Sequence, residues 1–379
     1  MHTRASSSVT ITPDAIAALD SALLALRPHE PTHHHISSLA NKLKRHIQLP
    51  SQPNEPNTTV WLFDSTAYHA PPHASSPWRL QPWETQIKAA YFGGESNGGG
   101  IVGSGSSEVL GGASESYQEE GKETRRRRQV RKQAVKAVIE AAGVGKMEVD
   151  EELVEGRLLP WTMKMIVGKT ITVKMEIRRN EDGGRTPEQT TRAQSMRLEP
   201  GNTSGTSTTI LRVPEDEYHD GEVLEVDATT GNDGSIPAKT RICSGKGFGV
   251  VSTLEGTLWQ LDSSDDPSIL RKVFCEVPKP VDGMPELLSQ ITTKLDNPPI
   301  WYLTTAPYCL YPMLRQFRDE LYPSGTIVVR EIDWTTASGL LASFTEKPKQ
   351  HKLEQLQQTY IQFPRRSMIL IGSAVEVRV

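Results

Sequence analysis

The first 92 residues show two kinds of hydrophobic pattern. Apolar residues three or four positions apart predict helices over residues 13–26, 36–47 and 82–92. A short apolar run at residues 60–63 predicts a strand between the second and the third of these helices. We therefore predict a mostly helical region over residues 1–92.

The composition changes after this region. Glycine, serine and glutamate dominate residues 93–124, which predicts a flexible linker. A basic run from Arg125 to Lys136 follows and merges into a helical pattern. A run of this kind is most often the solvated start of a helix, although a lipid head-group patch or a nuclear-import patch also fits it.

A β-rich texture follows the basic helix. Between residues 158 and 242, short β-branched runs such as residues 170–173 and 209–211 alternate with clusters of Gly, Asn, Asp and Ser. These patterns indicate half-buried strands that are joined by loops. The sequence thus predicts a basic helix and a small antiparallel β domain over residues 125–240.

The last third of the chain alternates strands with helices. Apolar runs predict a buried strand at residues 248–252 and further strands at residues 300–303, 326–329 and 368–371. Helical patterns lie between these strands, which predicts an α/β fold with a doubly wound parallel sheet over residues 241–379. The chain ends shortly after the fourth strand. Because ligands of such sheets bind at the carboxyl ends of the strands, we expect the chemistry in the residues that follow each strand.

Charge and cysteine content argue against several function classes. The 379 residues include 42 Lys and Arg against 46 Asp and Glu, a net charge of −4, which argues against a nucleic-acid binder. Three cysteines without a CxxC pair argue against a disulfide scaffold or a cysteine zinc site and favour a reducing compartment. No signal peptide is recognisable, and no run approaches the roughly 20 apolar residues of a membrane span. We therefore expect a cytoplasmic protein that contacts lipid only peripherally.

Four segments of the chain resemble the fungal actin-patch phosphatidate phosphatase family, which has a haloacid dehalogenase-like catalytic domain. Residues 251–257 read VSTLEGT, where the family has V-S-D-I-D-D-T after its first strand. Residues 302–312 read YLTTAPYCLYP, close to the family's Y-V-S-N-x-P-x-x-L-Y-P. Residues 363–374 read FPRRSMILIGSA, against F-P-x-x-x-F-I-L-I-G-D-S. Residues 61–68, WLFDSTAY, are similar to an N-terminal segment of the family.

The resemblance implies a Mg²⁺-dependent reaction that removes phosphate from phosphatidate and gives diacylglycerol. In the family, the first Asp of D-x-D-x-T attacks phosphorus and the second acts as general acid and base. Thr253 stands at the position of the nucleophile, and Glu255 stands at the position of the acid and base. Thr304 and Lys352 match the hydroxyl and the lysine that hold the phosphoryl oxygens, and they complete the predicted catalytic set, with Lys349 as the alternative lysine.

The same resemblance assigns substrate-binding and metal-binding positions. Thr257, Thr305 and Tyr308 are the predicted substrate-binding residues. The family holds Mg²⁺ with oxygen ligands, which suit this ion. The positions of the metal ligands are occupied here by Thr253, Glu255 and Ser373.

Three departures from the family pattern bear on activity. Thr253 is neutral, and its hydroxyl is a poor nucleophile without an adjacent base. Glu255 extends its carboxylate by one methylene, and a misplacement of about 1 Å can cost some 100-fold in rate. The family continues past the fourth strand with D-S-G-E-x-D-P-E, whereas the residues after Gly372 do not match; a shortened relative and a misread splice site both explain this. We predict a weak or inactive phosphatase, a pseudoenzyme that keeps the phosphate-binding half of its site.

A non-catalytic binding protein of the same fold is the alternative hypothesis. Such a protein would recognise anionic phospholipid at a membrane surface, or a protein of the actin patch, through the retained surfaces. Both hypotheses place the protein in the cytoplasm, at membranes or at cortical actin patches, and neither involves nucleic acid or a transmembrane segment.

Overall fold

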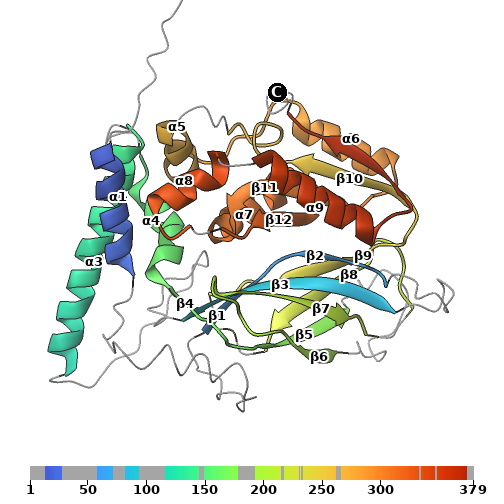
Figure 1. The fold of residues 1–379 in the computed structure, drawn as a ribbon, viewed down its shortest axis with the longest axis horizontal. Helices are drawn as coiled ribbons and strands as arrows, with labels where there is room; N and C mark the ends of the chain where they lie inside the picture. Colours follow the sequence, from blue (N-terminus) through green and yellow to red (C-terminus); the bar gives the residue numbers. More distant parts are fainter. Residues whose placement is uncertain are drawn as a thin grey trace, which may run out of the picture.

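The computed structural model of the chain describes most of its residues, and Figure 1 shows their arrangement. The described residues are 13–27, 58–70, 82–93, 116–144, 149–177, 193–214, 217–229, 231, 234–261, 266–332, 334–345 and 348–373. They form a mixed α/β fold in which a mostly antiparallel sheet packs beside a parallel sheet with helices around it.

The larger sheet combines strands that precede the basic helix in the sequence with strands that follow it. Its nine strands follow the order β1-β3-β2-β9-β8-β5-β6, and β4 and β7 also pair with β3. The described pairs are antiparallel except β2 with β9, which is parallel. The predicted regions 1–92 and 125–240 therefore share one sheet. Its strands are β1 (Thr58–Leu62), β2 (Ser65–His69), β3 (Trp83–Gly93), β4 (Lys164–Met165), β5 (Thr172–Ile177), β6 (Gln194–Arg197), β7 (Thr206–Arg212), β8 (Val223–Ala228) and β9 (Ala238–Ile242).

Strand β3 corrects the prediction of a helix over residues 82–92. The apolar residues Trp83, Ile87 and Tyr91 are four positions apart, a spacing that keeps side chains on one face of a strand as well as of a helix. β3 pairs with β1, β2 and β7, so partners on both sides satisfy its backbone groups. The neighbouring strands thus decide the conformation, and the N-terminal region is less helical than predicted.

A helical layer covers one end of the molecule. The prediction of a helix over residues 13–26 is confirmed by α1 (Pro13–Leu26), whose Leu19 and Leu23 are buried against α3 (Ser116–Ala141). α3 begins inside residues 93–124, where we predicted a linker, because many of its first residues are good helix formers such as Glu, Gln and Lys. The predicted helix at residues 36–47 lies outside the described residues. The layer continues with α4 (Glu151–Arg157) and the 3₁₀ turn η3 (Leu159–Thr162).

The parallel sheet confirms the prediction for the last third of the chain. Its order is β12-β11-β10-β13, and each pair is parallel. The strands are β10 (Gly247–Thr253), β11 (Ile300–Pro307), β12 (Thr326–Arg330) and β13 (Arg366–Ile371). All eight residues of β11 are buried, as expected for an inner strand of a covered sheet. The helical elements around it are α5 (Asp266–Leu270), η5 (Arg271–Cys275), α6 (Met284–Lys294), η6 (Tyr308–Leu310), α7 (Tyr311–Leu321), α8 (Ala337–Thr345) and α9 (Pro348–Gln362).

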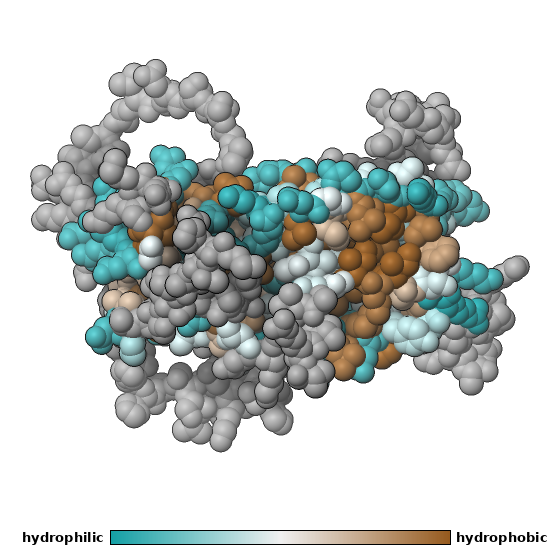
Figure 2. Space-filling view, turned by 90° about the horizontal axis from the view of Figure 1, so that it is seen from above, coloured by the Kyte–Doolittle hydropathy of each residue, from teal (hydrophilic) through white to brown (hydrophobic). Residues whose placement is uncertain are grey.

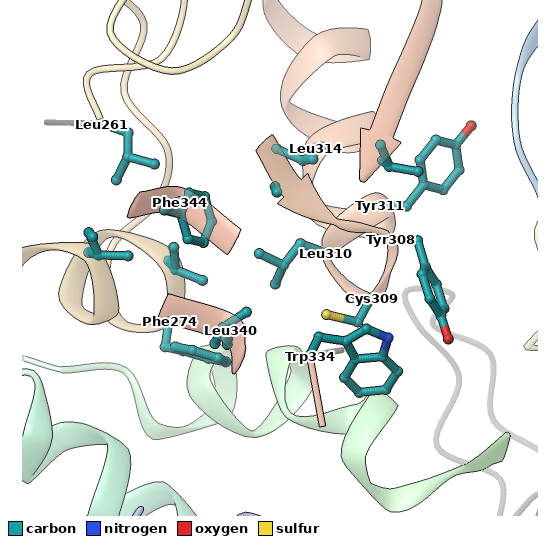
Figure 3. Packing of buried hydrophobic residues seen from close by; sticks show 14 of the residues in the cluster. Leu261, Phe274, Tyr308, Cys309, Leu310, Tyr311, Leu314, Trp334, Leu340 and Phe344 are labelled. Carbon is teal, nitrogen blue, oxygen red and sulfur yellow. The ribbon is translucent and has the colours of Figure 1, made fainter. Parts of the chain in front are cut away.

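The core between these helices is aromatic and aliphatic. Figure 3 shows Leu310, Leu314 and Phe344 pointing toward one another, with Leu340 beside Phe274. Seen from above, hydrophobic residues also gather on the surface over the part of the parallel sheet that carries β10 (Figure 2). No helix within the described ranges is long and apolar enough to cross a membrane.

Candidate functional site

The predicted site residues gather at the carboxyl end of the parallel sheet. β10 ends at Thr253 and its neighbour β13 ends at Ile371, so the segments that follow both strands emerge at the same edge. The chain turns tightly after β10, because the carbonyl of Leu254 accepts the N–H group of Leu258. Gly256 adopts φ +68° in this turn, a left-handed conformation that a side chain would strain. This turn holds the residues on either side of it in place.

Glu255 is the centre of the cluster and is 6% exposed. Its carboxylate accepts a hydrogen bond from the hydroxyl of Thr304 and another, at 3.1 Å, from the backbone N–H of Thr305. The Nζ atom of Lys352 lies 3.3 Å from the other carboxylate oxygen. The Thr304 hydroxyl also accepts the N–H of Ala306 at 3.0 Å. A single buried carboxylate is thus paired with a buried ammonium group and is oriented by β11.

Thr253 bonds to a hydroxyl rather than to a base. The hydroxyl oxygens of Thr253 and Thr257 lie 2.6 Å apart and share a hydrogen bond. Within the described part of the chain, the hydrogen bonds of Glu255 run to Thr304 and Thr305. A threonine hydroxyl becomes a competent nucleophile when a base removes its proton, and this arrangement supplies no such contact.

Ser373 completes the cluster from the end of β13. A methyl group placed on Gly256 would lie 3.5 Å from the Ser373 side chain, and one placed on Gly372 would lie 3.9 Å from Oγ1 of Thr253. The structure therefore brings Ser373 to the turn after β10 and its neighbour Gly372 to Thr253. The neutral hydroxyl of Ser373 occupies the position that the family resemblance assigns to an acidic metal ligand.

Tyr308 is not brought to this cluster. It is 1% exposed, and its hydroxyl donates to the carbonyl of Ser204, 2.6 Å away, in the part of the chain that builds the larger sheet. Its ring packs against Phe92 and Trp334, and Figure 3 shows it pointing away from Leu310. The side chain points from the end of β11 toward the larger sheet, so Tyr308 forms a contact between the two sheets.

The predicted metal ligands do not form a set that suits Mg²⁺. This ion takes oxygen ligands and is usually held in proteins by one or two carboxylates together with waters and substrate phosphates. Thr253 and Ser373 offer neutral hydroxyls, while the Glu255 carboxylate is already bonded to Thr304 and paired with Lys352. Over the residues that the structure describes, no group of three or more His, Cys, Asp or Glu side chains is arranged to hold a metal. The residues present therefore do not fit the ion that the resemblance implies.

A polar cavity of about 330 Å³ lies next to the cluster, between β3, the end of β12 and α9. Five charged or titratable side chains line it: Lys88, Arg330, Glu331, His351 and Glu354. The sequence analysis selected Lys352 and did not select His351, the residue before it in α9. Nε2 of His351 is buried and, among the described atoms, has no hydrogen-bond partner. Of these two consecutive residues of α9, Lys352 thus belongs to the cluster and His351 lines the cavity. Nothing in the sequence indicates that they face different sites.

Acidification is expected to destabilise the fold through His351. Burial, together with the cations of Arg330 and Lys88, lowers the pKa of His351 below its usual 6.5, against the opposite effects of the Thr304 backbone and Glu354. The unfolded chain therefore binds this proton more readily, and stability present above about pH 6.5 is lost as the pH falls below it. We expect the free energy of unfolding in urea to fall more from about pH 7.5 to 5.5 in the native chain than in His351→Gln. Equal decreases would contradict this role.

Comparison with known proteins shows what this part of the chain is similar to. Residues 248–376 match the family model described as the catalytic domain of phosphatidate phosphatase APP1. No curated protein matches the chain significantly. The matched range contains β10 apart from its first residue, and the strands β11 to β13. It also contains the whole Glu255 cluster, by which we mean Thr253, Glu255, Thr257, Thr304, Thr305, Lys352 and Ser373. The similarity of residues 248–376 to the phosphatidate phosphatase APP1 catalytic domain therefore covers about a third of the chain.

Proposed function

We propose that residues 248–376 form a haloacid dehalogenase-like domain that binds the phosphate head group of phosphatidate and hydrolyses it weakly or not at all. The family similarity supports a phospholipid substrate. Its members are in general Mg²⁺-dependent phosphatases, whereas the donor set at the Glu255 cluster does not fit this ion. We therefore expect that the domain still binds phosphatidate and that its phosphatase turnover is lost.

The observation that carries the proposal is the environment of Thr253. Its hydroxyl is bonded to Thr257, while the carboxylate of Glu255 is bonded to Thr304 and paired with Lys352. A nucleophilic mechanism needs a charged or activated oxygen at the end of β10. The Glu255 cluster offers a neutral hydroxyl at that place, so attack on phosphorus is expected to be slow.

The groups suited to a phosphate are nevertheless gathered at one place. The Lys352 ammonium and the hydroxyls of Thr304 and Thr257 are donors, and phosphoryl oxygens are strong acceptors of charge-assisted hydrogen bonds. A bound phosphate would compete with Glu255 for Lys352 and for the Thr304 hydroxyl, since both are anions. These donors also support the alternative of a purely non-catalytic binder of anionic phospholipid. A partner at the actin patch rests on the family resemblance alone.

Phosphate release from phosphatidate tests the loss of turnover. We expect release by the purified chain to stay at background with Mg²⁺ and with EDTA, while a water-soluble short-chain phosphatidate binds in equilibrium dialysis. Thr253→Asp places a carboxylate at the nucleophile position, and release above that of the native chain would show that the pocket still orients the phosphoryl group.

Two results would contradict the proposal in different ways. Release by the native chain that EDTA abolishes would mean that the site is catalytic despite Thr253. Absence of any binding of the short-chain phosphatidate would mean that the donors of the Glu255 cluster do not serve a phosphate. Thr257→Val is a useful companion variant, because it removes one donor while it leaves Lys352 in place.

A further inference from the structure

Helix α3 carries the densest positive charge of the chain. Seven of the twelve residues from Arg125 to Lys136 are Lys or Arg, and none is acidic. The whole run lies within α3. This charge contrasts with the net charge of −4 of the chain and is not used by the Glu255 cluster.

The packing of α3 leaves part of this charge in solvent. Arg128, Lys132 and Lys136 are exposed and are four positions apart, so they follow one another along the helix; we call them the basic stripe. Beside this stripe, apolar residues of α3 such as Val138 are buried in the core. Figure 1 shows α3 at the edge of the molecule, with one end extending beyond α1.

Among the side chains that the structure describes on α3, few acidic groups neutralise the basic ones. Of the four basic side chains described on α3, Arg131 has an acidic partner, Glu155, at 2.9 Å. No ion pair to another described residue involves the basic stripe.

We propose that the basic stripe docks the protein on an anionic lipid surface. This inference rests on the proposed function, because a membrane that contains phosphatidate is anionic. Each Lys or Arg near such a surface strengthens binding by about fivefold, and the attraction decays within a Debye length of about 10 Å. An exposed row of cations on a helix at the edge of the molecule can approach a flat surface without a clash with the two sheets.

A nucleic acid is the competing partner, and the observations favour it less. Proteins that bind single strands combine a basic groove with aromatic side chains on which bases stack. Residues 125–136 contain no aromatic residue, and the overall negative charge repels a polyanion at longer range. The basic stripe is convex rather than grooved, since it lies on one face of a single helix.

Vesicle sedimentation of the full chain tests the docking surface. The variant is Arg128→Gln with Lys132→Gln and Lys136→Gln, and the vesicles are phosphatidylcholine with or without one fifth phosphatidate or phosphatidylserine. We expect the native chain to bind both anionic vesicles, and the triple variant to bind them about 100-fold more weakly. The matched control, Lys239→Gln with Lys279→Gln and Lys294→Gln, removes the same charge from exposed positions elsewhere and should bind like the native chain.

The outcomes distinguish this inference from the proposed function. Binding of short-chain phosphatidate should be the same in the native chain and the stripe variant, because this soluble ligand needs only the Glu255 cluster. Vesicle binding that depends on the stripe, without any binding of the soluble ligand, would refute the proposed function and leave the docking surface standing. Equal vesicle binding by the native chain and the stripe variant, an equal loss in the control, or tighter binding to single-stranded RNA than to vesicles would each overturn the inference.

Discussion

Replacing Arg318 by methionine is expected to lower the free energy of unfolding by about 3–5 kcal/mol. Arg318 is 1% exposed, and its guanidinium lies 2.6 Å from the carboxylate of Asp64, which is also buried. Arg318 belongs to α7 and Asp64 lies between β1 and β2, so the pair joins the helices of the parallel sheet to the larger sheet. Methionine would leave the buried Asp64 carboxylate with the more distant cation of Arg315, 3.9 Å away. Equilibrium unfolding in urea measures the loss.

A second ion pair provides the control for burial. Arg131 and Glu155 lie 2.9 Å apart, but their side chains are 40% and 44% exposed. Arg131→Met should therefore cost only about 0–1 kcal/mol. Asp64→Asn in the Arg318→Met background should recover at least about 1 kcal/mol, because it removes the buried charge. Equal losses from Arg131→Met and Arg318→Met would show that burial does not govern the strength of these pairs.

Replacing Lys352 by methionine is expected to have two separate effects. Stability should fall by about 3 kcal/mol, since Glu255 is 6% exposed and Lys352 is its cation, 3.3 Å away. Binding of short-chain phosphatidate should fall below detection, because the variant lacks the ammonium group that we propose for the phosphate. Urea unfolding measures the first effect, and equilibrium dialysis measures the second.

A double variant separates the two effects of Lys352. Lys352→Met together with Glu255→Gln removes both charges of the pair, so much of the stability should return. Binding of short-chain phosphatidate should remain absent, because no ammonium group has been restored. If the double variant bound the ligand like the native chain, Lys352 would not belong to the phosphate site, and its role would be confined to the ion pair with Glu255.

Local patterns were sufficient for the parallel sheet. Residues 300–303 and 368–371 are continuous apolar runs, which are typical of strands in a parallel sheet. The inner strand β11 is buried throughout, whereas Leu370 of the edge strand β13 is 59% exposed. The structure confirms strands at both places, in β11 and β13. The prediction that chemistry follows the strands also placed Thr253 and Ser373 at one edge, because the carboxyl ends of neighbouring parallel strands meet there.

Local patterns were insufficient where two conformations bury the same residues. Trp83, Ile87 and Tyr91 are four positions apart, which suits one face of a helix and one face of a strand equally. The choice of a strand depends on the neighbouring strands, which lie both before and after β3 in the chain. A periodic pattern reports which residues are buried, whereas the partner that buries them is a property of the whole fold.

The sequence by itself determined the order of strands and helices in the last third and the residue types at the strand ends. The tertiary structure decided which of those residues meet. It paired Glu255 with Lys352, directed His351 to a separate cavity and turned Tyr308 toward the larger sheet. It also paired Asp64, between β1 and β2 of the larger sheet, with Arg318 of helix α7. These outcomes depend on directions of side chains fixed by distant segments, because a buried charge or hydroxyl takes whichever partner the packing brings within hydrogen-bond distance.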